Sequence, residues 1–342
     1  CKILNFQDSA GAFDPGIMYI EFKSIFLEIR ILGGSIMKEL YLPSTDGKNH
    51  LHVVIWEPNM PVIGIVQISH GMIEYIKRYD QFARYLNRQG ILVIGNDHLG
   101  HGETAKTDDN LGYFCPSNMS ETVVADLYEV TRFAKKNYPN VPYFLFGHSM
   151  GSFMARRYIM TYGNELDGVI ISGTGNQSGS VLKAGKIMVS LTKFFKGDRY
   201  RSKMLKNMFF SKFNDHIPNV RTSNDWLTKD ETIVDKYNTD KYCTYSFTVN
   251  GYRTLLDVLS FIQNSDNIAK IPKDLPVFLI AGEEDPVGNY GKAVKHVYEI
   301  YKKAGIKDIS IKLYKNDRHE LINETDKEDV YDDIRHWLIC HL

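Results

Sequence analysis

The stretch VPYFLFGHSMGSFMARRYIM, residues 141–160, changes from one kind of periodicity to another at a single serine, Ser149. Before the serine, the apolar and aromatic run 143–146 predicts a short buried strand. After it, the apolar residues recur at helical spacing. Gly147 and Gly151 flank the serine in the pattern G-x-S-x-G. Such a turn strains the serine backbone and exposes its hydroxyl beside the free N–H groups of the following helix, so we interpret Ser149 as a nucleophile.

The rest of the chain alternates short runs rich in Val and Ile with helical segments. Two runs near the start, KELYLP and HLHVVIWEP, are separated by the turn-like STDGKN and indicate a pair of strands. Six further runs have the same character: VIGIVQIS, ILVIGND, PYFLFG, DGVIISG, PVFLIAG and DISIKLY. Alternating strands and helices predict the α/β class, here with a mostly parallel eight-stranded sheet and helices on both faces.

One long interval interrupts this alternation, because residues 174–250 contain no core-type strand. Ligands of such sheets bind outside the carboxyl ends of the strands, and the interval begins at that edge. We therefore predict an inserted helical lid (a cap) at 174–250, which divides the core into residues 37–173 and 251–342.

Residues 1–36 are expected to form an N-terminal extension that precedes the domain, of upstream or cloning origin. Within it, GIMYIEFKSIFLEIRILGGSIM is apolar but broken by charges, so it predicts neither a membrane span nor a signal peptide. A lipid anchor on Cys1 would need further signals that this segment does not carry.

Charge and cysteine usage narrow the class of protein. Lys and Arg together number 41, as do Asp and Glu, so the overall balance indicates no nucleic-acid partner. The four cysteines lie far apart, without metal-ligand spacing or a disulfide framework. This usage favours a reducing cytoplasm.

A nucleophilic serine needs a base and an orienting acid, which in this kind of fold follow the serine in the order acid, then histidine. His319 lies in KNDRHELIN, a loop directly after the strand DISIKLY, where a base is expected. His296 and His336 fall within predicted helices and are interpreted as surface or packing residues.

The acid is sought at the end of the strand PVFLIAG, where three carboxylates are neighbours: Glu283, Glu284 and Asp285. Asp285 precedes Pro286, whose fixed φ and missing N–H make the loop rigid. We choose Asp285 as the acid and keep Glu284 as the second choice.

Two backbone N–H groups are needed to bind the oxyanion that forms when a carbonyl is attacked. The first is expected from Met150, the residue after the nucleophile, and the second from the loop ISHGMIEYIKRY after the third strand. In that loop Gly71 allows a close backbone approach, and Met72 would supply the N–H.

Five segments together resemble the monoacylglycerol lipase and lysophospholipase group of α/β-hydrolases: SHGMIEYIKRYDQFARYLNRQGILVIGNDHLGHGET, FLFGHSMGS, YNTDKY, LIAGEEDPVG and YKNDRHELINE. The likeness covers most of the chain after the extension and weakens in the lid. It implies the α/β-hydrolase fold, with Ser149 as nucleophile, Asp285 as acid and His319 as base. It also implies Met72 and Met150 as the oxyanion donors.

Several positions depart from the family pattern or compete for a role. Ser152 stands where many members carry another glycine, and the N-terminal extension matches nothing in the family. Asp97, His98 and His101 in NDHLGHGET could suggest a metal, but they lie in a Gly-rich turn that the family uses structurally, so no metal is expected. The resemblance implies that His148 packs or hydrogen-bonds within the turn, and we assign it no proton transfer.

The lid sequence combines positive charge with an apolar helical face. Between residues 180 and 213 there are nine basic residues and one acid. Five apolar residues share one helical face, opposite the lysines: Val181, Ala184, Met188, Leu191 and Phe195. We expect this face to pack on an acyl pocket. A second interpretation, which can coexist with the first, is an interfacial helix that binds anionic lipid.

We therefore expect a serine hydrolase of lipid carboxylic esters, with monoacylglycerol or lysophospholipid as the leading substrates and an acyl-enzyme intermediate. No metal or organic cofactor is required. The expected partner is a small lipid ester, with transient membrane-surface contact through the basic lid and a cytoplasmic or peripheral location. Two rivals stay open: a peptidase or thioesterase on the same fold, and a catalytically silent binding protein.

Overall fold

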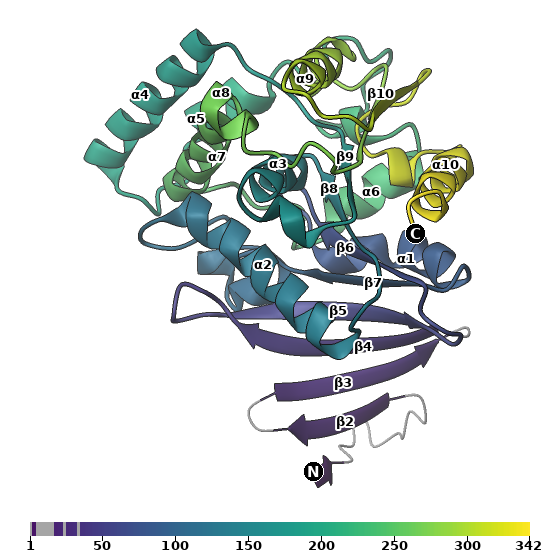
Figure 1. Cartoon of the computed structure of the whole chain (residues 1–342). Helices are drawn as coiled ribbons and strands as arrows, with labels where there is room; N and C mark the ends of the chain where they lie inside the picture. The colour runs from purple at the N-terminus through teal and green to yellow at the C-terminus, as the bar shows by residue number, and fades with distance from the viewer. Residues whose placement is uncertain (1, 5–16, 23–24, 33–34) are drawn as a thin grey trace.

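The computed structural model describes residues 2–4, 17–22, 25–32 and 35–342 (Figure 1). The described strands form one sheet in the order β1-β2-β3-β4-β5-β7-β6-β8-β9-β10-β11. Their bounds are β1 (Lys2–Leu4), β2 (Ile17–Phe22), β3 (Ile25–Leu32), β4 (Ser35–Pro43), β5 (His50–Pro58), β6 (Gly64–Ser69), β7 (Ile91–Asn96), β8 (Tyr143–His148), β9 (Gly168–Ser172), β10 (Val277–Gly282) and β11 (Ile309–Tyr314). Neighbours are parallel from β7 to β11 and antiparallel from β1 to β7. The predicted eight-stranded, mostly parallel sheet is therefore present as β4 to β11.

The sheet continues beyond these eight strands at the β4 edge. β3 pairs antiparallel with β4, with Ile31 opposite Ile36, and β2 and β1 follow outward. The unpaired N–H and C=O groups of an edge strand favour such an addition. In the sequence, Glu28 and Arg30 break an apolar run, but charges at alternate positions also fit a strand.

Helices cover both faces of the sheet (Figure 1). They are α1 (Asp80–Asn87), α2 (Met119–Asn137), α3 (Met150–Tyr162), α4 (Gly179–Lys196), α5 (Lys203–Phe210), α6 (Glu231–Thr239), α7 (Val249–Ile262), α8 (Ser265–Ile268), α9 (Lys292–Lys303) and α10 (Lys327–Ile339). In β8, Phe144 and Phe146 belong to the core formed with α1 and α10, whereas Tyr143 and Leu145 belong to the core formed with α2, α3 and α9. Burial on both faces explains why this strand reads as a continuous apolar run.

The interval between β9 and β10 holds α4 to α8 and, within the described chain, no strand. In Figure 1, α4 lies at the outer end of this group, away from the sheet. α7 packs on α3, and its residues Leu255 and Val258 join the main core. The division into core and lid at residues 173 and 250 stays a prediction.

The orientation of α4 differs from the predicted one. The face that packs on α7 consists of Leu182, Gly185 and Val189, because Gly185 has no side chain to keep Leu256 away. All five apolar residues expected on the pocket are exposed to solvent, and of these only Val181 and Ala184 also line the cavity. Most of the predicted face therefore points away from the protein.

None of the helices in the described part of the chain is long and apolar enough to cross a bilayer.

A buried ion network joins the antiparallel and parallel parts of the sheet. His52 of β5 lies 2.8 Å from an oxygen of Asp97 and 2.7 Å from an oxygen of Glu39, and its ring is almost fully buried. Lys77 also reaches Glu39 at 2.7 Å and Glu103 at 2.9 Å. Burial alone would lower the pKa of His52, but the hydrogen bonds with Asp97 and Glu39 raise it from 6.5 to about 9.

This network predicts a loss of stability at alkaline pH. Because the folded-state pKa of His52 lies above the unfolded value, its contribution is fully present below about pH 6.5 and is lost as pH rises through about 9. The contribution is on the order of 3 kcal/mol. Urea unfolding of the wild type and of His52→Gln should show a difference in the free energy of unfolding that shrinks over this window. Parallel pH curves for the two proteins would contradict the assignment.

Candidate active site

Ser149 occupies the sharp turn between β8 and α3. Its φ of 54° and ψ of −121° place a non-glycine residue in a strained region. A Cβ on Gly147 would lie 2.6 Å from the carbonyl oxygen of Gly151, and one on Gly151 would overlap the carbonyl oxygen of Ser69. The N–H of Ser149 donates to the carbonyl of Ser172 in β9 at 3.0 Å. The two glycines therefore permit the turn, and β9 holds it.

The structure brings Asp285 and His319 together at the carboxyl ends of β10 and β11. Nδ1 of His319 lies 2.9 Å from Oδ1 of Asp285, and both side chains are buried. The same carboxylate oxygen accepts the N–H of Val287 at 2.8 Å. Of the three neighbouring carboxylates, this is the one beside His319, whereas Glu283 is exposed and Glu284 is half-buried.

The tautomer of His319 follows from this contact. If Nδ1 donates to the carboxylate, Nε2 of the neutral ring carries the lone pair. Nε2 is buried and, among the described residues, has no hydrogen-bond partner. The ring is held from two sides, by Trp226 at a centroid distance of 5.0 Å and by Gly173, where a Cβ would lie 3.1 Å from the ring. The ring is therefore oriented and has one nitrogen available to accept a proton.

The loop that carries Met72, one of the two predicted oxyanion donors, lies directly against the serine. A Cβ on Gly71 would lie 3.1 Å from Cβ of Ser149. In the described part of the chain, no hydrogen bond occupies the backbone N–H of Met72 or Met150. Free donors beside the serine are what oxyanion binding requires, so the arrangement is consistent with the predicted roles of both residues.

These groups line one cavity of about 710 Å³. Its lining residues include Ser149, His319, Met72 and Met150. Much of the remaining wall is apolar and comes from α3, α4, α5 and α7, with side chains such as Phe153, Val181, Leu182, Phe209, Leu255 and Leu259. A largely apolar cavity beside a nucleophile suits the apolar part of a substrate.

Asp97, His98 and His101 do not converge on a common point. Oδ2 of Asp97 faces His52 at 2.8 Å, the N–H of His98 donates to His70 at 3.0 Å, and His101 bonds the carbonyl of Leu99 at 3.0 Å. Burial lowers the pKa of His101 to about 3, so its ring is neutral. These contacts agree with a structural turn.

Two clusters of acidic groups elsewhere have metal-like spacing, but each already holds a lysine. The first consists of Glu39, His52 and Glu103, and Lys77 lies 2.7 Å and 2.9 Å from its two carboxylates. The second consists of Asp317, Glu324 and Asp326, where Lys229 lies 2.5 Å from Asp317 and 3.3 Å from Asp326. The ammonium group takes the place of a cation in both clusters.

Sequence reasoning missed a cluster of four charged groups beside the cavity: Glu74, Arg78, His148 and Glu320. Glu74 and Arg78 are four residues apart, a spacing that brings side chains together on a helical turn. That spacing is the one local signal, since the partner Glu320 is 242 residues away from Arg78.

A serine at a strained strand-to-helix turn, followed by an acid and a histidine at the ends of later parallel strands, defines the α/β-hydrolase class. Residues 61–326 match the family described as serine aminopeptidase, S33, and the chain belongs to that family. Within it, the relatives and the fold make the chain an α/β-hydrolase of the monoacylglycerol lipase group, whose members are carboxylic ester hydrolases.

The relatives are similar over most of their length. A monoacylglycerol lipase of Mycolicibacterium smegmatis is 24% identical over 293 residues, which cover 84% of this chain and 92% of that protein. A monoglyceride lipase of Rattus norvegicus is 26% identical over 290 residues, 83% of this chain and 84% of that protein. The crystal structure of a carboxyl esterase from Bacillus coagulans matches with a TM-score of 0.82 and 28% identity, over 88% of this chain and 97% of that one.

The choice of acid can be tested on ester hydrolysis. An acid that fixes the histidine tautomer contributes up to about 10⁴ in kcat. We expect Asp285→Asn to lower kcat by about 10² to 10⁴, and Glu284→Gln, as the matched control, to change it little. Steady-state rates on a chromogenic ester measure both. A crippling effect of Glu284→Gln instead would move the role of acid to Glu284.

Proposed function

We propose that this protein is a serine hydrolase that cleaves the ester bond of monoacylglycerol or lysophospholipid through an acyl-enzyme. The observation that carries the proposal is the largely apolar cavity that Ser149 and His319 help to line. The names of the relatives support a lipid substrate, since they include monoacylglycerol lipases and, at 24% identity over 282 residues, a phospholipase of Bacillus subtilis.

In the proposed reaction, Oγ of Ser149 attacks the ester carbonyl while Nε2 of His319 takes its proton. Asp285 holds the imidazole and stabilises its cation, and the N–H groups of Met72 and Met150 bind the oxyanion. The tetrahedral intermediate collapses, His319 protonates the departing alcohol, and the acyl group stays on Ser149. Water, deprotonated by the same histidine, then attacks the acyl-enzyme and releases the fatty acid and the free serine.

An aminopeptidase, the rival that the family description suggests, would need to bind a substrate ammonium group. Two carboxylates line the cavity, Glu74 and Glu320, and both are already paired with Arg78 at 2.8 Å and 2.7 Å. No unpaired carboxylate among the described cavity residues is left for an ammonium group. This favours a lipid ester over a peptide N-terminus.

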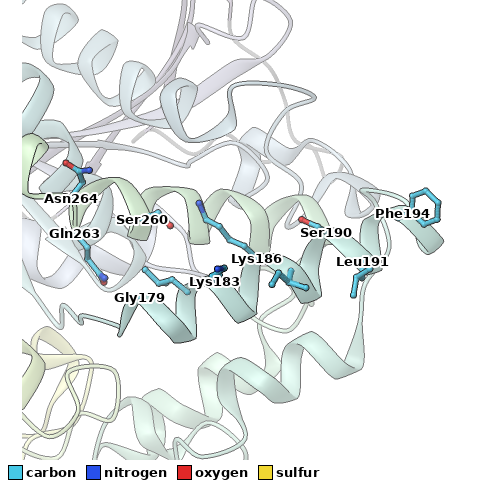
Figure 2. A pocket seen from close by; sticks show the side chains of 11 residues that line it. Gly179, Lys183, Lys186, Ser190, Leu191, Phe194, Ser260, Gln263 and Asn264 are labelled. Atoms are coloured by element: carbon cyan, nitrogen blue, oxygen red, sulfur yellow. The ribbon is translucent and has the colours of Figure 1, made fainter.

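We also propose that the outer side of α4 makes transient contact with an anionic membrane surface, so that the protein is cytoplasmic and peripheral. A groove of about 890 Å³ lies between α4 and α7, and Figure 2 shows Lys183 and Lys186 along it with Phe194 at one end. Phe194 is 82% exposed and Phe195 is 73% exposed. Lys186 is paired with Asp257 at 3.0 Å, whereas Lys183 makes no ion pair within the described chain. Exposed aromatic side chains beside basic residues are typical of interfacial helices.

The substrate assignment predicts a strong dependence on acyl length. Each buried methylene contributes about 0.8 kcal/mol, so two more carbons should raise kcat/KM by about tenfold until the cavity is full. We expect medium- and long-chain monoacylglycerol to exceed acetate esters, weak turnover of triacylglycerol, and no cleavage of proline-terminated peptides. A panel of these compounds, assayed by fatty-acid or amine release, measures the preference.

Ser149→Ala is the control for the panel and should abolish both hydrolysis and labelling by a fluorophosphonate. Equal rates on acetyl esters and aminopeptidase substrates would remove the lipid assignment. A folded wild type that neither hydrolyses esters nor reacts with the fluorophosphonate would favour the silent binding protein.

The membrane contact predicts that the double substitution of Phe194→Ser with Phe195→Ser weakens binding to vesicles that contain phosphatidylglycerol. Burial of one such side chain contributes about 1.5–3 kcal/mol, so the loss should be tenfold or more in a sedimentation assay. Ile339→Ser removes an apolar side chain of α10 that is 43% exposed and should bind like the wild type. Binding that is equal for all three proteins, or insensitive to salt, would contradict the proposed surface.

A further inference from the structure

Four charged side chains lie together at the cavity: Glu74, His148 and Glu320 line it, and Arg78 pairs with the two carboxylates. Arg78 contacts both oxygens of Glu320 at 2.8 Å and 2.7 Å and also reaches Glu74 at 2.8 Å. Nδ1 of His148 lies 3.0 Å from the other oxygen of Glu74. Glu74, His148 and Glu320 are buried, and Arg78 is mostly so. A buried charge is costly unless it is paired, and here two anions face two cations.

The pKa shifts of Glu74 and His148 agree with both side chains being charged. Burial alone would raise the pKa of Glu74, but the hydrogen bond from His148 and the charges of His148 and Arg78 lower it. Burial alone would lower the pKa of His148, but the hydrogen bond and charge of Glu74 raise it. A protonated imidazole donates from both nitrogens, so Nε2 of His148 can also donate to the carbonyl of His319 at 3.3 Å.

The cluster touches three of the four segments that form the candidate site, all but the loop that carries Asp285. Glu74 accepts the N–H of Gly71, which precedes Met72 in the oxyanion loop. His148 is the neighbour of Ser149 in the turn, and Glu320 is the neighbour of His319 in the base loop. Glu74 and its partners thus connect segments that are far apart in the chain.

The oxyanion loop needs such a connection because its backbone is strained. Ile73 has a φ of 58°, a conformation that β-branched residues rarely adopt and that persists only where the surroundings hold it. On one side the carbonyl of Ile73 accepts the hydroxyl of Tyr237 at 2.9 Å. On the other side Glu74 bonds back to Gly71, so its side chain closes the loop around the strained residue.

We infer that Glu74 is a positioning residue, whose carboxylate holds the loop around Met72 where its N–H can bind the oxyanion of the proposed reaction. This inference rests on the proposed function. One oxygen of Glu74 accepts from Gly71, from the hydroxyl of Tyr79 at 3.0 Å and from His148, while the other accepts from Arg78. A carboxylate has the acceptor capacity for all of these donors, whereas the amide group of glutamine would present a donor to Arg78 or to the loop.

Two substitutions of Glu74 distinguish a positioning role from a role in charge balance alone. Glu74→Gln removes the charge and one acceptor, and Glu74→Asp keeps the charge but withdraws the carboxylate by one methylene. Because loss of one oxyanion donor costs about 10²–10³ in kcat, we expect both variants to lose about 10²-fold in kcat with little change in KM. Glu39→Gln is the matched control: it removes a buried carboxylate that pairs with Lys77 and His52 and does not line the cavity.

The measurements are kcat and KM on a medium-chain ester, the affinity for an alkyl boronic acid, and the melting temperature. A boronic acid forms a tetrahedral adduct with serine, so its affinity should fall by the same factor as kcat in both Glu74 variants. Glu39→Gln should lose stability and keep the kcat of the wild type.

A folded Glu74→Gln with the kcat of the wild type would overturn the inference. So would a Glu74→Asp variant of full activity, because charge balance alone would then explain the cluster, or an effect on KM alone. Should Glu74→Gln fail to fold, Glu74→Asp decides the question by itself. An inactive wild type that is not labelled by a fluorophosphonate would instead overturn the proposed function, so the two failures are distinguishable.

Discussion

The close approach of backbone segments at the carboxyl edge of the sheet is the constraint on which the rest of the structure depends. A Cβ on Gly151 would overlap the carbonyl oxygen of Ser69, and a Cβ on Gly282 would overlap that of Asp317. The first approach lets α3 begin directly over β6, which leaves Ser149 at the turn with a positive φ. The second lets the loop that carries His319 cross the carboxyl end of β10, and Asp285 lies just after that end. Only glycine permits both, because it has no Cβ.

The buried polar atoms of the candidate site that lack hydrogen-bond partners also lie at this edge. Oδ2 of Asp285 and Nε2 of His319 are buried without a hydrogen-bond partner among the described residues. Such groups lower stability, and of the two, Nε2 of His319 is the one that the proposed reaction would use. The paired charges of Glu74 and Arg78 lie close behind them and supply rigid support without a net charge of their own.

One helix, α4, contributes both to the wall of the cavity and to an exposed apolar surface. α4 turns its narrow face, centred on Gly185, toward α7 and leaves Phe194 in solvent, while Val181 lines the cavity. Apolar side chains of α4 therefore continue from its exposed surface to the cavity. The solved relatives share the fold at 28% identity or less, and fold alone does not select a substrate. Selectivity is expected to depend on this helix and on the cavity wall that it completes.

The sequence by itself determined the class of the sheet, the turn at Ser149 and the loop that carries His319. These features depend on hydrophobic periodicity and turn-forming residues, which are visible in a few neighbouring positions. It also favoured Asp285 through the adjacent proline, and the structure places that carboxylate beside the histidine. Only the tertiary structure decided which face of α4 is buried, how β1 to β3 lengthen the sheet, and which charges pair. The contact of Arg78 with Glu320 joins residues 242 positions apart, and no local pattern encodes a pair at that distance. Such pairs arise when the loops at one sheet edge are brought together, which is a property of the whole fold.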